Sequence, residues 1–328
     1  PSNTNMSELA PAKPTKLDAA EIITGLAASA EYQRNKEYKY PLQRQIARTA
    51  LELAGMDEAI FSEDDYEFDS RDATPETALH AVVGLLPSYV YALEGIRHDR
   101  TVQRLDTADY RSMKKRGAHF NHAIKSLIEQ DPSLTFSNVV ETVMNLYGMM
   151  NRDRWGDDRK GFESEARWFR TYFEGAMRGM EQEVLARQII EEINRACPLK
   201  DPATSKKIPR VSVNPHVSAE DDLKGTDLYV TLEGVTFPID IKASERTAEN
   251  VRRKHIRAKD SHSPAKDFHN KAIITTGISH VEMHNALRVS PNRAFKAAPA
   301  MLDKLYAARQ EYLDKHATNP TEELAMAA

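Results

Sequence analysis

Two short apolar segments joined by a glycine turn limit the folds that this chain can adopt. Residues 228–232 and 237–242 alternate apolar with polar side chains, and Glu233-Gly234 lies between them. Alternation with a period of two is typical of β-strands, and a short loop that contains glycine favours a hairpin. The sequence therefore predicts two antiparallel strands whose far ends lie side by side.

Three charged residues lie at the open end of this predicted hairpin. Asp227 opens the first strand, Asp240 lies in the second, and Lys242 follows it by two residues. Side chains at i and i+2 share one face of a strand, so Asp240 and Lys242 should project together beside Asp227. Ile239 and Ile241 then face the core. Charges on an apolar strand pair cost free energy unless they serve a site or pair with each other, so a plain salt bridge is the alternative.

Two carboxylates and a lysine in this arrangement suit phosphodiester hydrolysis. Carboxylate oxygens are the ligands that Mg²⁺ prefers, and the metal lowers the pKa of its bound water and neutralises charge on the phosphate. A lysine orients that water, and helps to deprotonate it if its own pKa is depressed. We therefore expect Asp227, Asp240 and Lys242 to be catalytic with Mg²⁺ or Mn²⁺, and the carbonyl of Ile241 to be a further ligand.

The two motif segments also carry a family resemblance. Residues 225–230 (GTDLYV) and 237–244 (FPIDIKAS) resemble the signature of the PD-(D/E)XK nuclease superfamily, which includes restriction endonucleases and Holliday-junction resolvases. Thr226 stands where the superfamily's name has proline, and the likeness in element order covers about residues 170–290. The resemblance implies an α/β, restriction-endonuclease-like mixed sheet flanked by helices, and metal-dependent nuclease activity.

The resemblance further implies an acidic residue on the helix that precedes the first strand. Glu181 shares an i, i+4 stripe with Leu185 and Ile189. This phase places Glu181 at the edge of the buried face, so we expect it to be catalytic and to bind the metal. Glu183 and Glu174 are the alternatives on the same helix.

The rest of the chain divides into two halves. Residues 16–160 show helical periodicity and predict an all-α N-terminal domain, with the polar stretch 151–161 as the candidate boundary. Residues 161–316 predict a nuclease-like domain. It begins with a long helix at about residues 163–195, in which Gly175 or Gly179 suggests a break. The further expected elements are a strand at residues 207–217, the hairpin, a helix, a buried strand at 271–276, and closing helices at 280–287 and about 299–315. Residues 1–15 and 317–328 are expected to be flexible tails.

The helix expected after the hairpin, at residues 246–259, is basic. Its bases outnumber its single acid, Glu249, and they are Arg246, Arg252, Arg253, Lys254, Arg257 and Lys259. A basic helix beside a metal site suits a phosphate backbone, so we expect these residues to bind nucleic acid. A solvated helix face is the alternative interpretation.

Composition limits the setting in which the chain works. The formal net charge of −4 over 328 residues argues against a coat-type nucleic-acid binder. The single cysteine, Cys197, excludes an internal disulfide and favours a reducing compartment, the cytoplasm. The most apolar run, residues 77–93, is too short and interrupted to span a membrane, so no membrane partner is expected.

The sequence thus predicts a cytoplasmic Mg²⁺- or Mn²⁺-dependent endo- or exonuclease that acts on nucleic acid, with DNA favoured. A non-catalytic binding or assembly protein on the same fold, and an RNA-directed nuclease, are the alternatives. The helical half is expected to bind the substrate, a protein partner or a second copy of the chain as a homodimer. His280 and His284 have the spacing of a zinc pair, but the sequence offers no evident third ligand.

Overall fold

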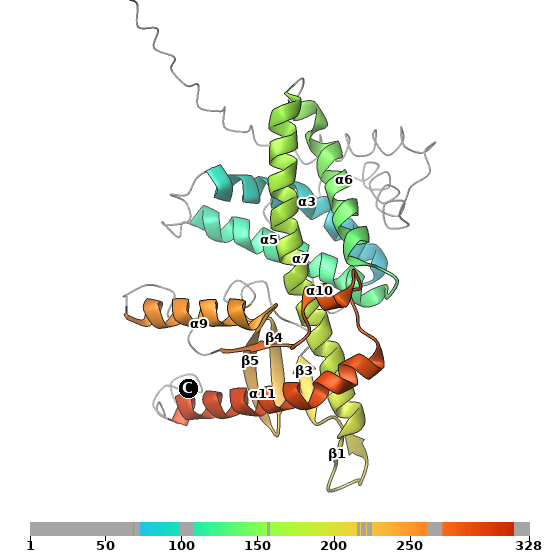
Figure 1. Cartoon of the computed structure of the whole chain (residues 1–328), viewed down its shortest axis with the longest axis vertical. Coiled ribbons are helices and arrows are strands. Elements are labelled where there is room, and N and C mark those ends of the chain that lie inside the picture. Colours follow the sequence, from blue (N-terminus) through green and yellow to red (C-terminus); the bar gives the residue numbers. More distant parts are fainter. Residues whose placement is uncertain are drawn as a thin grey trace, which may run out of the picture.

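The computed structural model describes residues 68, 73–98, 108–155, 158–214, 217, 221, 225–260 and 271–317. The chain is a mixed α/β structure, with helices gathered at one end of the long helix α7 and a mixed four-stranded sheet at the other (Figure 1). The tails expected at residues 1–15 and beyond Ala317 lie outside the described residues, as do residues 16–67 of the predicted helical domain.

Four described helices build the N-terminal half: α3 (Pro75–His98), α5 (Ala108–Gln130), α6 (Phe136–Trp155) and the first part of α7 (Arg159–Ala196). Thr74 precedes the first of them and accepts a hydrogen bond from the Thr77 N–H at 3.2 Å. Asp158 does the same for α7, accepting from the Gly161 N–H at 3.0 Å. These short polar side chains satisfy N–H groups that the first helical turn leaves without partners, which fixes where each helix begins.

Stacked aromatic rings hold these helices together. The ring centroids of Tyr89 and Phe120 lie 4.4 Å apart, and those of Tyr147 and Phe169 also lie 4.4 Å apart. All four rings are buried, and each pair joins two different helices. Stacked aromatic pairs contribute about 0.5–1.5 kcal/mol beyond the burial of their surface. The four rings belong to one hydrophobic core, here called the first core. Within it, the Tyr89–Phe120 pair holds α5 against α3.

The four-stranded sheet has the spatial order β3 (Val211–Asn214), β4 (Leu228–Leu232), β5 (Val235–Lys242) and β6 (Ala272–Thr275). The first three strands are antiparallel neighbours, and β6 is parallel to β5. The predicted hairpin is confirmed: Leu232 pairs with Val235, and Glu233 and Gly234 both have positive φ, 50° and 77°. This is the backbone of a tight two-residue turn that matches the twist of the strands.

Helices complete the C-terminal half. The basic helix is confirmed as α9 (Glu245–Asp260), and it supplies the crossover that a parallel neighbour of β5 requires. The last helix, α11 (Pro291–Ala317), runs along the sheet in Figure 1 and packs on α7 and on the strands. Leu185, Phe237 and Ile239 lie in the second core, which these elements enclose.

Two elements differ from the expectation. The strand expected from residue 207 is interrupted at Pro209, because proline cannot donate a ladder hydrogen bond. Lys207–Ile208 forms β2, which pairs with β1 (Leu199–Lys200) in a separate two-stranded sheet. The helix expected at residues 280–287 is only α10 (His280–Met283), because the backbone then turns left-handed at His284, with a φ of 49°.

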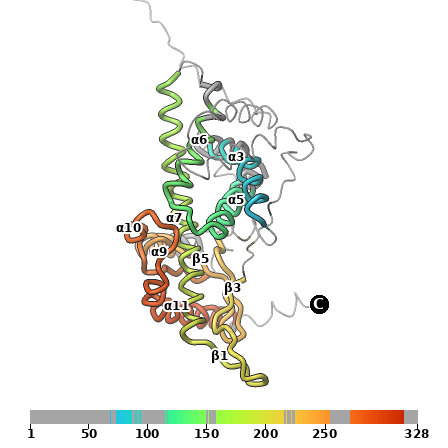
Figure 2. Tube along the Cα trace, turned by 90° about the vertical axis from the view of Figure 1, so that its right-hand side faces the viewer, coloured from blue at the N-terminus to red at the C-terminus, as the bar shows by residue number. Residues whose placement is uncertain are grey.

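The helix α7 belongs to both cores. It continues without interruption past Gly175 and Gly179, where the sequence suggested a break. Its buried apolar residues up to Val184 pack in the first core, and those from Leu185 onward pack in the second. Figures 1 and 2 show the helical half at one end of α7 and the sheet at the other. The two cores therefore meet within one continuous helix, between Val184 and Leu185.

A second connection ties the two halves together after β6. The Phe136 N–H donates to the Asn285 carbonyl at 3.0 Å, and the Ser137 N–H donates to the Asn285 side chain at 2.8 Å. These bonds satisfy the first turn of α6 with a residue that follows α10. Arg288 donates to the carbonyls of Ile128 and Glu129 at the end of α5. The helical half is thereby held in a defined position over the sheet.

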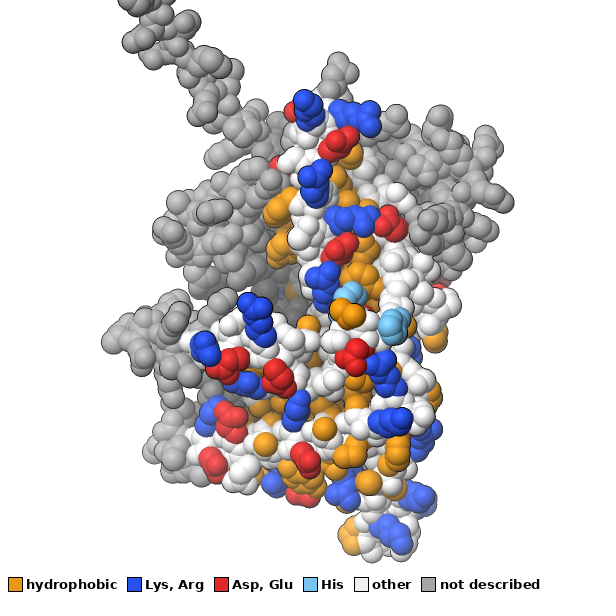
Figure 3. Space-filling model, viewed as in Figure 1, with side chains coloured by type: hydrophobic (Ala, Val, Ile, Leu, Met, Phe, Trp, Pro, Cys, Tyr) orange, Lys and Arg blue, Asp and Glu red, His pale blue; other side chains and the backbone are white. Residues whose placement is uncertain are grey.

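The visible surface mixes charges of both signs. Figure 3 shows lysine and arginine side chains interspersed with acidic ones along α7 and around the sheet, rather than gathered in one patch on that face. Among the helices that the structure describes, none is both long and apolar enough to cross a membrane.

Candidate functional site

The site is built around the open end of the β4–β5 hairpin. The backbone N–H of Asp227 donates to the Ile239 carbonyl at 3.0 Å, which extends the ladder by one position beyond β4. The Asp227 carboxylate then accepts a hydrogen bond from the Ile241 N–H at 2.6 Å. Asp240 lies on β5 between Ile239 and Ile241 and is buried, and its charge acts on the Asp227 carboxyl group. The hairpin thus brings the two aspartates close enough to interact electrostatically.

Lys242 lies on the same side of β5 as Asp240. Its ammonium group forms an ion pair with the Asp240 carboxylate, and its side chain is 24% exposed. Ile239 and Ile241 face the opposite way and are buried in the second core. Burial disfavours the protonated form of Lys242, but the charges of Asp227 and Asp240 outweigh this effect and raise its pKa. Lys242 is therefore a cation in this arrangement.

The helix α7 contributes Glu183 to this cluster. Its Oε2 lies 2.7 Å from Nζ of Lys125, and its charge acts on both Asp227 and Lys242. From the sequence, Glu181 was the expected acidic metal ligand on this helix, and Glu183 was an alternative. Helical phase identified the buried stripe of α7 but gave no information on which edge of the stripe borders the hairpin.

Glu181 lies elsewhere in the structure. It is fully buried, and its Oε2 lies 2.8 Å from Nδ1 of His280 on α10. Burial raises the pKa of its carboxyl group, and the hydrogen bond with His280 opposes that change. The structure therefore joins Glu181 to α10 and brings Glu183 to the aspartates.

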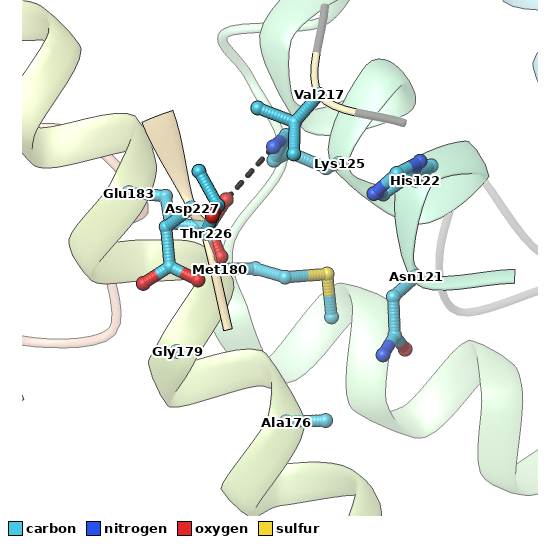
Figure 4. Close-up of a pocket in the computed structure, with 10 residues that line it drawn as sticks. All are labelled: Asn121, His122, Lys125, Ala176, Gly179, Met180, Glu183, Val217, Thr226 and Asp227. Carbon is cyan, nitrogen blue, oxygen red and sulfur yellow. Dashed lines mark hydrogen bonds and ion pairs between the residues drawn. The ribbon is translucent and has the colours of Figure 1, made fainter. Parts of the chain in front are cut away.

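A pocket opens beside this cluster, between the two halves of the chain (Figure 4). It encloses about 400 Å³, including its open mouth. Its walls come from α5, from α7 and from the segment before β4. Its lining residues are Asn121, His122, Lys125, Ala176, Gly179, Met180, Glu183, Val217, Thr226 and Asp227.

The contribution of α5 to this pocket could not be predicted from the sequence. In the sequence Lys125 resembles any exposed lysine of an amphipathic helix, whereas the fold places its Nζ 2.7 Å from Glu183.

The cluster concentrates negative charge among largely buried side chains. Burial raises the pKa of Asp227 well above its ordinary value, and repulsion from Glu183 and Asp240 adds to the effect. The charge of Lys242 acts in the opposite direction but does not cancel it. Carboxylates held together in this way favour a proton or a cation between them.

The donor set fits a hard divalent cation in kind, since three carboxylates are the ligands that Mg²⁺ and Mn²⁺ prefer. Among the described residues, no group of three or more acidic, histidine or cysteine side chains is already arranged to hold a metal ion. Each carboxylate has its own partner instead: Glu183 pairs with Lys125, Asp240 with Lys242, and Asp227 with the Ile241 N–H. A cation would bind here by replacing some of these contacts. The expected ligand carbonyl of Ile241 lies between Asp240 and Lys242 on β5.

The basic helix α9 packs against β5 and β6. Arg252 donates to the Ile273 carbonyl at 2.8 Å, and Arg253 pairs with Glu249 at 3.0 Å. Arg246 is exposed in the first turn. The side chains of the other three bases expected to bind nucleic acid, Lys254, Arg257 and Lys259, lie outside the described part of the structure.

The threonines at the end of β6 have structural partners. Thr275 is bonded to Glu245, and the Lys304 ammonium donates to its hydroxyl at 2.7 Å, which ties α9, β6 and α11 together. Thr276 donates to Gln182 on α7 at 2.5 Å. These contacts fix β6 beside the strand that carries Lys242.

Comparison with known proteins gives no further guide: no family model, no curated protein and no solved structure matches the chain.

Proposed function

We propose that this chain is a divalent-metal-dependent nuclease with a restriction-endonuclease-like core, acting on DNA in preference to RNA. The observation that carries the proposal is the convergence of Glu183, Asp227, Asp240 and Lys242 at the open end of one hairpin, beside a pocket. These are the residue types that phosphodiester hydrolysis needs, held on rigid elements.

The arrangement of elements supports this core. A helix precedes three antiparallel strands, a crossover helix follows, and a fourth strand pairs in parallel with the strand that carries Asp240 and Lys242. That order is what the resemblance of residues 225–244 to PD-(D/E)XK nucleases implies.

Each residue has a role that follows from its surroundings. Glu183, Asp227 and Asp240 would hold the cation, which when bound activates water and neutralises charge on the phosphate. Lys242 keeps its proton, because the neighbouring aspartates raise its pKa. We therefore assign Lys242 to orienting the attacking water and stabilising negative charge on the phosphate, and not to removing the proton from that water.

The expected partner is the phosphate backbone of a nucleic acid. Arg246 and Arg253 are exposed on α9, directly after the strand that carries Lys242. Electrostatic contacts of this kind position a backbone without reading its sequence. We retain the six bases of α9 as the proposed nucleic-acid-binding surface and Mg²⁺ or Mn²⁺ as the proposed cofactor.

One observation favours a non-catalytic alternative. The carboxylates of the cluster already have partners within the chain, as they would in a structural ion-pair network between two halves of a protein. A network of that kind needs no metal. It predicts a protein that binds neither Mg²⁺ nor Mn²⁺ and hydrolyses neither DNA nor RNA.

A cleavage assay separates these functions. Purified full-length protein is incubated with single-stranded and duplex DNA and with RNA, in Mg²⁺, in Mn²⁺ and in EDTA. We expect metal-dependent cleavage of DNA that Asp240→Ala and Lys242→Ala abolish, with Arg195→Ala as an exposed control far along α7. Preference for RNA would revise the substrate, and wild-type rates in both site variants would refute the proposed catalytic centre.

A further inference from the structure

The side of the pocket opposite the hairpin belongs to the helical half. Asn121, His122 and Lys125 lie on one face of α5 and line the same pocket as Asp227 (Figure 4). The Lys125 side chain is only 12% exposed. Lysine is seldom buried to this extent without a specific partner. Glu183, whose Oε2 lies 2.7 Å away, is that partner.

The ion pair differs from its neighbour one helical turn further on. Glu129 of α5 and Arg187 of α7 form a pair of reversed charge, with 3.5 Å between the Arg187 Nε and the Glu129 Oε1. Both pairs connect α5 to α7, but only Lys125 and Glu183 line the pocket. Arg187 therefore provides a matched control for contacts that merely hold the two helices together.

The charges of the cluster indicate what Lys125 does. Three carboxylates, from Glu183, Asp227 and Asp240, face two ammonium groups, from Lys125 and Lys242. A divalent cation bound to the carboxylates would make the cluster positive and would compete with Lys125 for Glu183. An ammonium group released inside a pocket wall needs a new anion, because burying an unpaired charge is costly. The phosphate of a bound nucleic acid is the anion that the proposed function brings to this pocket.

We infer that the helical half supplies a substrate-binding residue of the site, Lys125. In the metal-free protein Lys125 neutralises Glu183. Once a divalent cation has bound Glu183, Lys125 contacts a phosphate of the nucleic acid. This inference rests on the proposed nuclease function and extends it, because it makes α5 part of the substrate-binding wall. No covalent step is involved, and the ammonium group exchanges one anion for another. Arg288, which donates to the Ile128 and Glu129 carbonyls, helps to hold the end of α5 in the position that this role requires.

Two equilibrium measurements on the full chain test this exchange. The first titrates the protein with Mn²⁺ in the absence of nucleic acid. The second measures binding of a labelled DNA duplex over a range of salt concentrations, with Ca²⁺ present so that binding is observed apart from cleavage. Both are carried out on wild type, Lys125→Met and Arg187→Met, and thermal unfolding of each variant shows whether it is folded.

The expected effects of Lys125→Met have opposite signs. Mn²⁺ should bind about tenfold more tightly, because a positive charge that competes for Glu183 is removed. DNA should bind more weakly, and the slope of log affinity against log salt should decrease by about 0.9, the loss of one phosphate contact. Arg187→Met should change neither quantity. A variant that was merely less well folded would weaken both interactions together.

Several outcomes would overturn the inference. Unchanged Mn²⁺ and DNA affinities in Lys125→Met, or a decrease in both, would contradict the exchange while leaving the proposed nuclease intact. If the wild type itself binds no Mn²⁺, the nuclease proposal fails and this inference fails with it. Lys125→Gln, which keeps a hydrogen-bonding group beside Glu183 but no charge, should show the same opposite shifts and replaces Lys125→Met if that variant does not fold.

Discussion

The Lys125 ammonium lies 2.7 Å from the Glu183 carboxylate, with the two side chains only 12% and 14% exposed. This ion pair joins α5, in the helical half, to the point on α7 that borders the strand carboxylates. Because the two cores meet on α7 at Val184 and Leu185, the pair lies at the junction of the two halves. The site is therefore shaped by both halves of the chain.

The two acids of α7 should respond differently to removal of their charge. Glu183→Gln removes a carboxylate from the cluster and should reduce Mn²⁺ affinity by about tenfold or more, together with DNA cleavage. Glu181→Gln changes a residue paired with His280 and should leave Mn²⁺ affinity within about threefold of wild type, since Glu181 is not among the proposed metal ligands. Calorimetric titration of both variants measures the difference. The reverse order would restore the assignment of Glu181 made from helical phase.

Asp227 should make metal-free stability depend on pH. Its pKa is raised in the folded state by burial and by repulsion from Glu183 and Asp240. A raised carboxyl pKa favours the folded state below the unfolded pKa of about 3.9, and this contribution is lost as pH rises through the folded value. In EDTA, Asp227→Asn should therefore be more stable than wild type at neutral pH, because the variant buries no carboxylate charge beside Glu183 and Asp240.

Thermal unfolding from acid to neutral pH measures this effect. The unfolding temperature of Asp227→Asn should fall less with rising pH than that of wild type in EDTA. Mg²⁺ should raise the unfolding temperature of wild type more than that of the variant, because a ligand that binds only the folded state stabilises it. Parallel pH profiles for the two proteins would contradict the proposed repulsion.

His280 should stabilise the fold through Glu181. The His280→Ala variant leaves a fully buried carboxyl group without its hydrogen-bond partner, which should cost about 1–3 kcal/mol. The control is His284→Asn, because His284 is exposed and asparagine tolerates its left-handed backbone. Chemical denaturation of both variants provides the comparison. Equal stability of His280→Ala and wild type would show that this contact is dispensable.

Two glycines should respond oppositely to alanine. Gly234 has a φ of 77° in the hairpin turn, so Gly234→Ala should destabilise the fold by about 1 kcal/mol. Gly175 lies within α7 with open space around the position of a new Cβ, so Gly175→Ala should stabilise it by about 0.5–1 kcal/mol. Denaturant midpoints of the two variants test both signs. A stabilising effect at Gly234 would mean that the hairpin turn differs from the one described.

The hairpin could be predicted because its information is local. Alternation of apolar residues defines both strands, the glycine turn fixes their register, and the register places Asp227 beside Asp240. A one-residue shift would have moved Asp240 to the core face, so the pattern allows only one arrangement. The basic helix and the buried fourth strand were predictable for the same reason.

The contribution of the helical half could not be predicted, because it depends on contacts between distant segments. The partners Lys125 and Glu183 are separated by 58 positions, and nothing in the periodicity of α5 distinguishes Lys125 from a solvated lysine. The choice between Glu181 and Glu183 depends on which side of α7 meets the hairpin. That side is set by the packing of two cores on one helix, which no pattern within α7 encodes.

The initial rate of DNA cleavage as Mg²⁺ is increased decides whether the hairpin cluster is a metal-dependent nuclease centre. For wild type we expect a rate that rises to saturation with Mg²⁺ and disappears in EDTA. For Asp240→Asn, a variant of nearly the same shape, we expect a rate lower by about a hundredfold or more. A wild-type rate that is independent of Mg²⁺, or equal rates for the two proteins at saturating Mg²⁺, would show that the cluster is not the metal-dependent centre.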